Sequence, residues 1–171
     1  SSPDGKLDTY LSILDTMKHK RVKLYVDIQG KYFHQLNPHQ IELIKPNLDE
    51  LRDAGFNEEV TTKSLINAGR RLNQLGYKNC LISLAEKGAI LITQRAVYQS
   101  DAQKGIVVRP YGAGDAMVAG YIYADERGLS ERDKLAYGIA TASAHVFEFD
   151  MSMDLIDKII NDVIITEVFD D

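Results

Sequence analysis

The sequence has no tryptophan and a single cysteine, Cys80, whereas small secreted domains are commonly stabilised by disulfides. One thiol cannot close a disulfide within the chain, so a cytoplasmic setting is the simplest interpretation. No apolar run approaches the ~20 residues that a membrane-spanning helix needs. Residues 1–5 lack the basic stretch followed by an apolar one that is typical of a secretory signal. We therefore expect no membrane partner.

Basic residues are fewer than acidic ones, with 20 Lys and Arg against 25 Asp and Glu, and the net charge is −5. Nonspecific binding of nucleic acid needs a clustered basic surface, so we expect no nucleic-acid partner. The charge leaves nucleotide binding open, because amides, helix ends and metal ions hold phosphates locally. The four histidines lack the paired spacing of metal ligands.

The 171 residues, 44% of them hydrophobic, favour one domain over residues 1–171. Apolar residues at helical spacing predict helices at 7–17, 61–75, 131–146 and 154–163, and another that follows Gly114. Alternating or continuous apolar runs predict strands at 22–28, 41–44, 80–84 and 89–92. The last two strands form a hairpin that turns at Gly88. Strands alternate with helices in the first half, which predicts an α/β fold with a mostly parallel sheet flanked by helices.

The most informative segment is Gly112-Ala113-Gly114-Asp115, directly before a run of small and apolar residues. Glycines ahead of a helix let the backbone approach a ligand, and the first helical turn offers unpaired N–H groups. Such an anion site suits a phosphate, and an aspartate beside it can take a proton from an attacking hydroxyl. Alternatively, the glycines only turn the chain and Asp115 stabilises the first helical turn.

Residues 112–120, Gly-Ala-Gly-Asp-Ala-Met-Val-Ala-Gly, resemble the C-terminal signature of the phosphofructokinase B family. The resemblance implies a ribokinase-like fold, Asp115 as the catalytic base, and an anion hole built from the amides of Gly112, Ala113 and Gly114. It also implies ATP and Mg²⁺ as cofactors and a phosphosugar as the second substrate.

Two earlier segments are similar to other motifs of that family. Lys45-Pro46-Asn47, followed by Glu50, resembles its Lys-Pro-Asn-x-x-Glu stretch, which implies that Asn47 binds ATP and that Asn47 and Glu50 hold Mg²⁺ through water. From the residues alone, Asn47 can equally be a helix N-cap and Glu50 its capping-box partner. The second segment resembles the family's Ser-Leu-Gly-x-x-Gly turn beside ATP and comprises Ser83, Leu84, Ala85, Glu86, Lys87 and Gly88.

Weaker similarities involve Ser2–Gly5 and Asp27–Gly30, and they point to 1-phosphofructokinase or tagatose-6-phosphate kinase. Two departures stand beside them, namely Ala85 in place of a glycine and Arg109 where ribokinase-type members carry an acidic residue for a monovalent cation. By resemblance, the N-terminal half of the family, with its sugar-binding residues and β-lid, is absent. We therefore expect a truncated, inactive fragment with an open sheet edge that allows self-association or a homodimer. Rival interpretations are another ribokinase-like small-molecule kinase, or a non-catalytic nucleotide-binding remnant.

Overall fold

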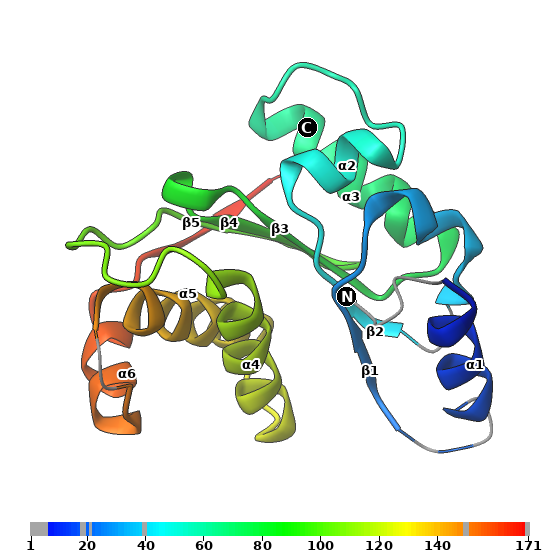
Figure 1. Ribbon diagram of the computed structural model, residues 1–171. Coiled ribbons are helices and arrows are strands. Elements are labelled where there is room, and N and C mark those ends of the chain that lie inside the picture. Colours follow the sequence, from blue (N-terminus) through cyan, green and yellow to red (C-terminus); the bar gives the residue numbers. More distant parts are fainter. Residues whose placement is uncertain (1–6, 18–19, 21, 39–40, 149–150, 170–171) are drawn as a thin grey trace.

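Helices cover both faces of one sheet in the computed structural model, which describes residues 7–17, 20, 22–38, 41–148 and 151–169 (Figure 1). The helices are α1 Leu7–Met17, α2 Leu48–Asp53, α3 Thr62–Leu75, α4 Ala113–Glu126, α5 Glu131–Phe147 and α6 Met153–Ile160, with 3₁₀ turns η1 Gly30–Gln35 and η3 Ala85–Lys87. The strands are β1 Leu24–Val26, β2 Ile41–Ile44, β3 Asn79–Ser83, β4 Ala89–Ile92, β5 Val97–Ser100 and β6 Ile165–Val168. Within these ranges, no helix has the length and apolar character that crossing a membrane requires.

The six strands lie in the order β1-β2-β3-β4-β5-β6. β1, β2 and β3 pair in parallel, whereas β4, β5 and β6 each join their neighbour antiparallel. β1, β2, β3 and β5 consequently run in one direction and β4 and β6 in the other. The mostly parallel α/β sheet and the β3–β4 hairpin are both confirmed, and the described sheet has β1 and β6 at its edges.

Side chains alternate across the central strands, so both faces of the sheet are buried. Ile44 and Ile82 pack into the core on one face, and Leu43 and Leu81 into the core on the other. Figure 1 shows α1, α2 and α3 on one side of the sheet and α4, α5 and α6 on the opposite side. This arrangement places the start of α4 against the same sheet that carries residues 27 and 45.

α4 and α5 approach closely at Gly120, where any side chain would collide with α5. A Cβ built on Gly120 would lie 2.3 Å from the carbonyl oxygen of Tyr137 and 2.5 Å from Oγ1 of Thr141. This contact explains why position 120 is a glycine.

The elements differ from the sequence expectation mainly at the sheet margins. The strand expected over 22–28 is only β1, Leu24–Val26. β5 and β6 were not expected, because each is a four-residue run whose strand character comes from pairing with its neighbours. The expected helix ends are otherwise close to those observed, and Gly76 ends α3 in the left-handed region with φ 114°.

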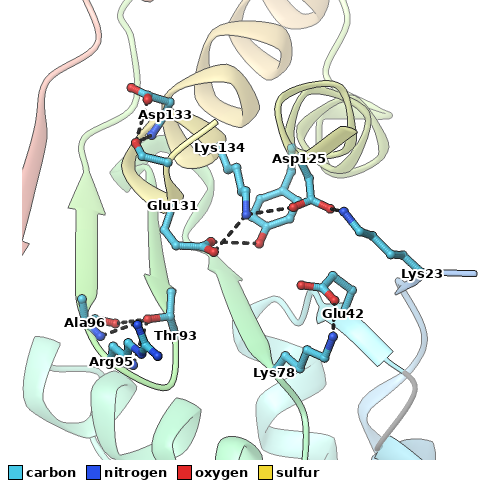
Figure 2. Close-up of polar contacts among 12 residues, drawn as sticks. Lys23, Glu42, Lys78, Thr93, Arg95, Ala96, Asp125, Glu131, Asp133 and Lys134 are labelled. Atoms are coloured by element: carbon cyan, nitrogen blue, oxygen red, sulfur yellow. Dashed lines mark hydrogen bonds and ion pairs between the residues drawn. The ribbon is translucent and has the colours of Figure 1, made fainter. Parts of the chain in front are cut away.

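A buried polar network ties the first strand to the helices on the α4 side (Figure 2). The Asp125 carboxylate, 4% exposed, accepts hydrogen bonds from Lys23 Nζ at 2.6 Å, from Lys134 Nζ at 2.8 Å and from the Tyr25 hydroxyl. Lys134 also pairs with Glu131 at 2.9 Å. Burial alone would raise the pKa of Asp125, but the hydrogen bonds from Lys134, Lys23 and Tyr25 outweigh it and lower that pKa to about 2.

Candidate active site

The first turn of α4 begins at a glycine in the left-handed region. Gly112 is the N-cap residue with φ 88°, and no side chain caps the helix there. Its carbonyl accepts the amide of Ala116 at 3.0 Å, which starts the helix. The amides of the first turn have no partner within their own helix, so this end of α4 offers N–H donors to an anion. Asp115 lies in the same turn and is exposed, where a ligand can reach it.

A buried cation lies beside that turn. Lys45 is 4% exposed, and its Nζ lies 3.0 Å from Oδ2 of Asp27. A Cβ built on Gly114 would lie 3.2 Å from Lys45 Nζ and 3.8 Å from Asp27 Oδ2. Glycine at 114 therefore leaves room for the lysine to approach the anion site, where its charge attracts phosphate.

Sheet topology explains how Asp27 and Lys45 meet. Asp27 follows β1 and Lys45 follows β2, and these strands are parallel, so their carboxyl ends lie together. The backbone adds to this, since the Lys45 amide donates to the Val26 carbonyl at 3.0 Å. In open α/β sheets, ligands bind outside the carboxyl ends of the strands, which is where this pair lies.

Asn47 and Glu50 form the capping box that begins α2. The Asn47 Oδ1 accepts the Glu50 amide at 2.9 Å, and the Glu50 Oε2 accepts the Asn47 amide at 2.8 Å. Burial raises the pKa of Glu50, although the hydrogen bond from Asn47 and the charge of Lys45 act in the opposite sense. The capping interpretation is confirmed.

The glycine that follows β1 has a packing role at this place. A Cβ on Gly30 would lie 1.6 Å from the carbonyl oxygen of Glu50, so only glycine lets η1 pack against α2. The weakly matched stretch Asp27–Gly30 thus lies next to the capping box. The other weak match, Ser2–Gly5, lies outside the described residues.

The turn between β3 and β4 contains two left-handed residues. Gly88 has φ 92°, and a Cβ there would lie 2.0 Å from the Ser100 carbonyl oxygen. Ala85 has φ 52° and is the one non-glycine residue with positive φ in the described part of the chain. The family's glycine at this position therefore has a conformational reason, and Ala85 adopts the same backbone at a cost.

The structure brings several of the residues expected in the site to the carboxyl ends of the central strands β2 and β3. Ser83 pairs with Asn47 in a parallel bridge, and its amide donates to the Pro46 carbonyl at 3.0 Å. Leu84 is partly buried and Gly88 is buried in the hairpin turn, whereas Ala85, Glu86 and Lys87 are exposed at its tip. The role of Lys45 was not predicted, although its place directly after a strand within the Lys-Pro-Asn stretch was an available signal.

The donors at the site suit an anion better than a bare metal ion. Across the described ranges, no three His, Cys, Asp or Glu side chains gather in a way that could hold a metal. Amides of α4, the Lys45 ammonium and an exposed carboxylate instead form a set that fits a phosphate ligand and proton transfer from a hydroxyl.

Comparisons with known proteins agree on one family. The model of the family described as pfkB family carbohydrate kinase matches residues 2–156. A 1-phosphofructokinase of Borreliella burgdorferi is 37% identical over 142 residues, which cover 80% of this chain and 45% of that protein. A D-tagatose-1-phosphate kinase of Bacillus licheniformis is 31% identical over 142 residues, covering 82% of this chain and 46% of that protein.

A solved structure has the same fold. Phosphofructokinase-2 from Escherichia coli, in complex with substrates and products, matches with a TM-score of 0.81 at 23% identity. The match covers 91% of this chain and 52% of that one. The chain thus spans about half the length of the curated relatives that it matches, 48% and 45% for two 1-phosphofructokinases.

Proposed function

The chain belongs to the pfkB family of carbohydrate kinases, and from this membership we propose that it supplies the ATP-binding and catalytic part of a phosphosugar kinase. The proposal is carried by the geometry at the start of α4, where Gly114 lies against the buried Lys45 and Asp115 faces solvent in the same turn. The resemblance that residues 43–51, 83–90 and 112–120 indicated is confirmed by the family match.

In the proposed reaction, Asp115 takes the proton from a sugar hydroxyl while the oxygen of that hydroxyl attacks the γ-phosphorus of ATP. The new bond joins the hydroxyl oxygen to that phosphorus, the bond to the β–γ bridging oxygen breaks, and ADP leaves. The amides of Gly112, Ala113 and Gly114 stabilise the charge that develops on the transferred group. Lys45, held in place by Asp27 at 3.0 Å, adds a fixed positive charge beside them.

The residues present fit ATP with Mg²⁺. ATP phosphates would lie at the start of α4, beside Lys45, with the β3–β4 turn, Ser83–Gly88, along the nucleotide. Mg²⁺, which binds ATP phosphates and keeps several waters, would neutralise phosphate charge and meet Asn47 and Glu50 through water.

We propose a phosphorylated hexose as acceptor, namely fructose 1-phosphate, fructose 6-phosphate or tagatose 6-phosphate. Tagatose 1-phosphate joins these candidates because one matched relative is named D-tagatose-1-phosphate kinase. The support is that matched relatives are named 1-phosphofructokinase and D-tagatose-1-phosphate kinase. Another small-molecule acceptor of a ribokinase-like kinase is the alternative. The buried single thiol of Cys80 and the family's metabolic role favour a cytoplasmic enzyme.

The chain alone is expected to bind ATP without transferring phosphate. It covers about half of each relative, and β1 is at the edge of the described sheet, open to further strands or to a second copy. Without a bound sugar in line with the γ-phosphate, the positioning that supplies most of the catalysis is missing. A non-catalytic nucleotide-binding role is the second candidate, and the exposed Asp115 favours the kinase.

Calorimetric titration of the chain with Mg·ATP tests the proposal, beside an assay of ADP release with each phosphosugar and light scattering for mass. We expect weak Mg·ATP binding, no sugar-dependent ADP release, and self-association. Absence of any Mg·ATP binding by the folded chain would refute the nucleotide site. Sugar-dependent turnover by a monomer would show instead that the chain holds its own acceptor site.

A further inference from the structure

Residues 108–111, which lead into the anion site, are hydrogen-bonded to the last turn of α5. The amides of Val108 and Arg109 both donate to the Val146 carbonyl, at 2.8 Å and 3.0 Å. Nε2 of His145 lies 2.8 Å from the carbonyl oxygen of Tyr111. Residues far apart in the chain thus hold the backbone immediately before Gly112.

The chemistry of this contact fixes which imidazole nitrogen carries the proton. A carbonyl oxygen only accepts, so Nε2 of His145 must be the donor, in the neutral Nε2–H tautomer or in the imidazolium. The His145 ring also packs against Gly112, since a Cβ built on Gly112 would lie 2.9 Å from Nε2 of His145. No side chain caps α4, and the imidazole of a neighbouring helix contacts the carbonyl of the residue before its N-cap.

We propose that His145 is a positioning residue for phosphoryl transfer, an inference that rests on the proposed function. The C=O and N–H of one peptide point in opposite directions. Holding the Tyr111 carbonyl toward α5 therefore turns the Gly112 amide away from α5. It also sets the entry of the chain into the first turn of α4, where the anion-binding amides lie. His145 acts through this backbone and touches no reacting atom.

Three substitutions separate a hydrogen-bond role from a packing role. His145→Gln places an amide N–H close to the position of Nε2–H, His145→Asn reaches only as far as Nδ1, and His145→Leu removes the donor. His34→Leu is the matched control, because Nε2 of His34 lies 3.3 Å from the Ala54 carbonyl, away from α4. Urea unfolding of each variant confirms that it is folded.

The first readout needs no nucleotide and is the hydrogen exchange of the Ala116 amide, which donates to the Gly112 carbonyl. Loss of one hydrogen bond is worth up to about tenfold in an equilibrium, so we expect roughly tenfold faster exchange in His145→Leu and His145→Asn. In His145→Gln and His34→Leu the rate should stay within about twofold of wild type. The imidazole ¹⁵N spectrum should show a proton on Nε2 of His145.

The second readout is the Mg·ATP dissociation constant from calorimetry. It should rise about tenfold in His145→Leu and His145→Asn and stay within about threefold of wild type in His145→Gln. Unchanged Ala116 exchange in His145→Leu, failure of Gln to restore wild-type values, or a deprotonated Nε2 would each overturn the inference. If the wild-type chain binds no Mg·ATP, the proposed function fails, while exchange and tautomer still decide whether His145 holds the turn.

Discussion

Replacing Asp125 by asparagine should cost the protein about 3 kcal/mol of unfolding free energy. Removing one partner of a buried ion pair costs about 3–5 kcal/mol, because the other charge stays buried without compensation. The lower end applies here for two reasons. Lys23 is 46% exposed and can turn to water, and Lys134, although only 9% exposed, keeps Glu131 at 2.9 Å.

Urea unfolding followed by circular dichroism measures the effect, with Glu58→Gln as control. Glu58 pairs with Arg71 at 3.5 Å, and both side chains are more than half exposed, so its loss should cost less than about 0.5 kcal/mol. In a domain of this size, the Asp125→Asn change should lower the melting temperature by roughly 6–12 °C. A cost below about 1 kcal/mol would refute the view that the network in Figure 2 braces β1 against α4 and α5.

The Asp125 carboxylate also makes the unfolding free energy depend on pH in the acid range. Its pKa of about 2 is lower than that of an unfolded aspartate, so its contribution is complete above about pH 4. That contribution is lost as the pH falls from about 4 through 2. The wild-type unfolding free energy should therefore drop by about 2 kcal/mol more than that of Asp125→Asn over this interval. If the unfolding free energies of wild type and Asp125→Asn fell equally with pH, this pH dependence could not be assigned to Asp125.

Four further outcomes are expected. In a complete kinase containing this chain, Asp115→Asn should leave ATP binding nearly intact and lower kcat at least ~100-fold, and a value within threefold of wild type would remove Asp115 as the base. Glu50→Gln should raise the Mg²⁺ concentration needed for activity by weakening the metal's outer contacts, so an unchanged Mg²⁺ titration would leave Glu50 with only its capping role. K⁺ should not activate such a kinase beyond a Na⁺ control, because the guanidinium of Arg109 carries a fixed positive charge that repels a cation. Severalfold activation by K⁺ would show that the cation site lies elsewhere. Ala85→Gly should stabilise the chain by about 0.5 kcal/mol in urea, because it relieves the left-handed strain at φ 52°, whereas Ala85→Val should destabilise it.

Local signals in the sequence were sufficient for much of the fold. Gly76 and Gly88 ended a helix and turned a hairpin as expected, since a positive φ depends mainly on the residue itself. The capping box of Asn47 and Glu50 was likewise readable, because both of its hydrogen bonds join residues three apart. Asp115 and the turn before it were identified by motif, and they lie at the start of α4, while the role of Asp115 as base stays a prediction.

What the sequence by itself determined was therefore the set of local conformations and the family that the motifs at 43–51, 83–90 and 112–120 indicated. Tertiary structure alone decided that Asp27 pairs with Lys45 beside Gly114. It also decided the hydrogen bond between His145 and the Tyr111 carbonyl, and the formation of strands β5 and β6. Each of these depends on contacts between residues distant in the chain. Such contacts form only when the sheet order and the packing of α5 bring their partners together, and no local pattern encodes that proximity.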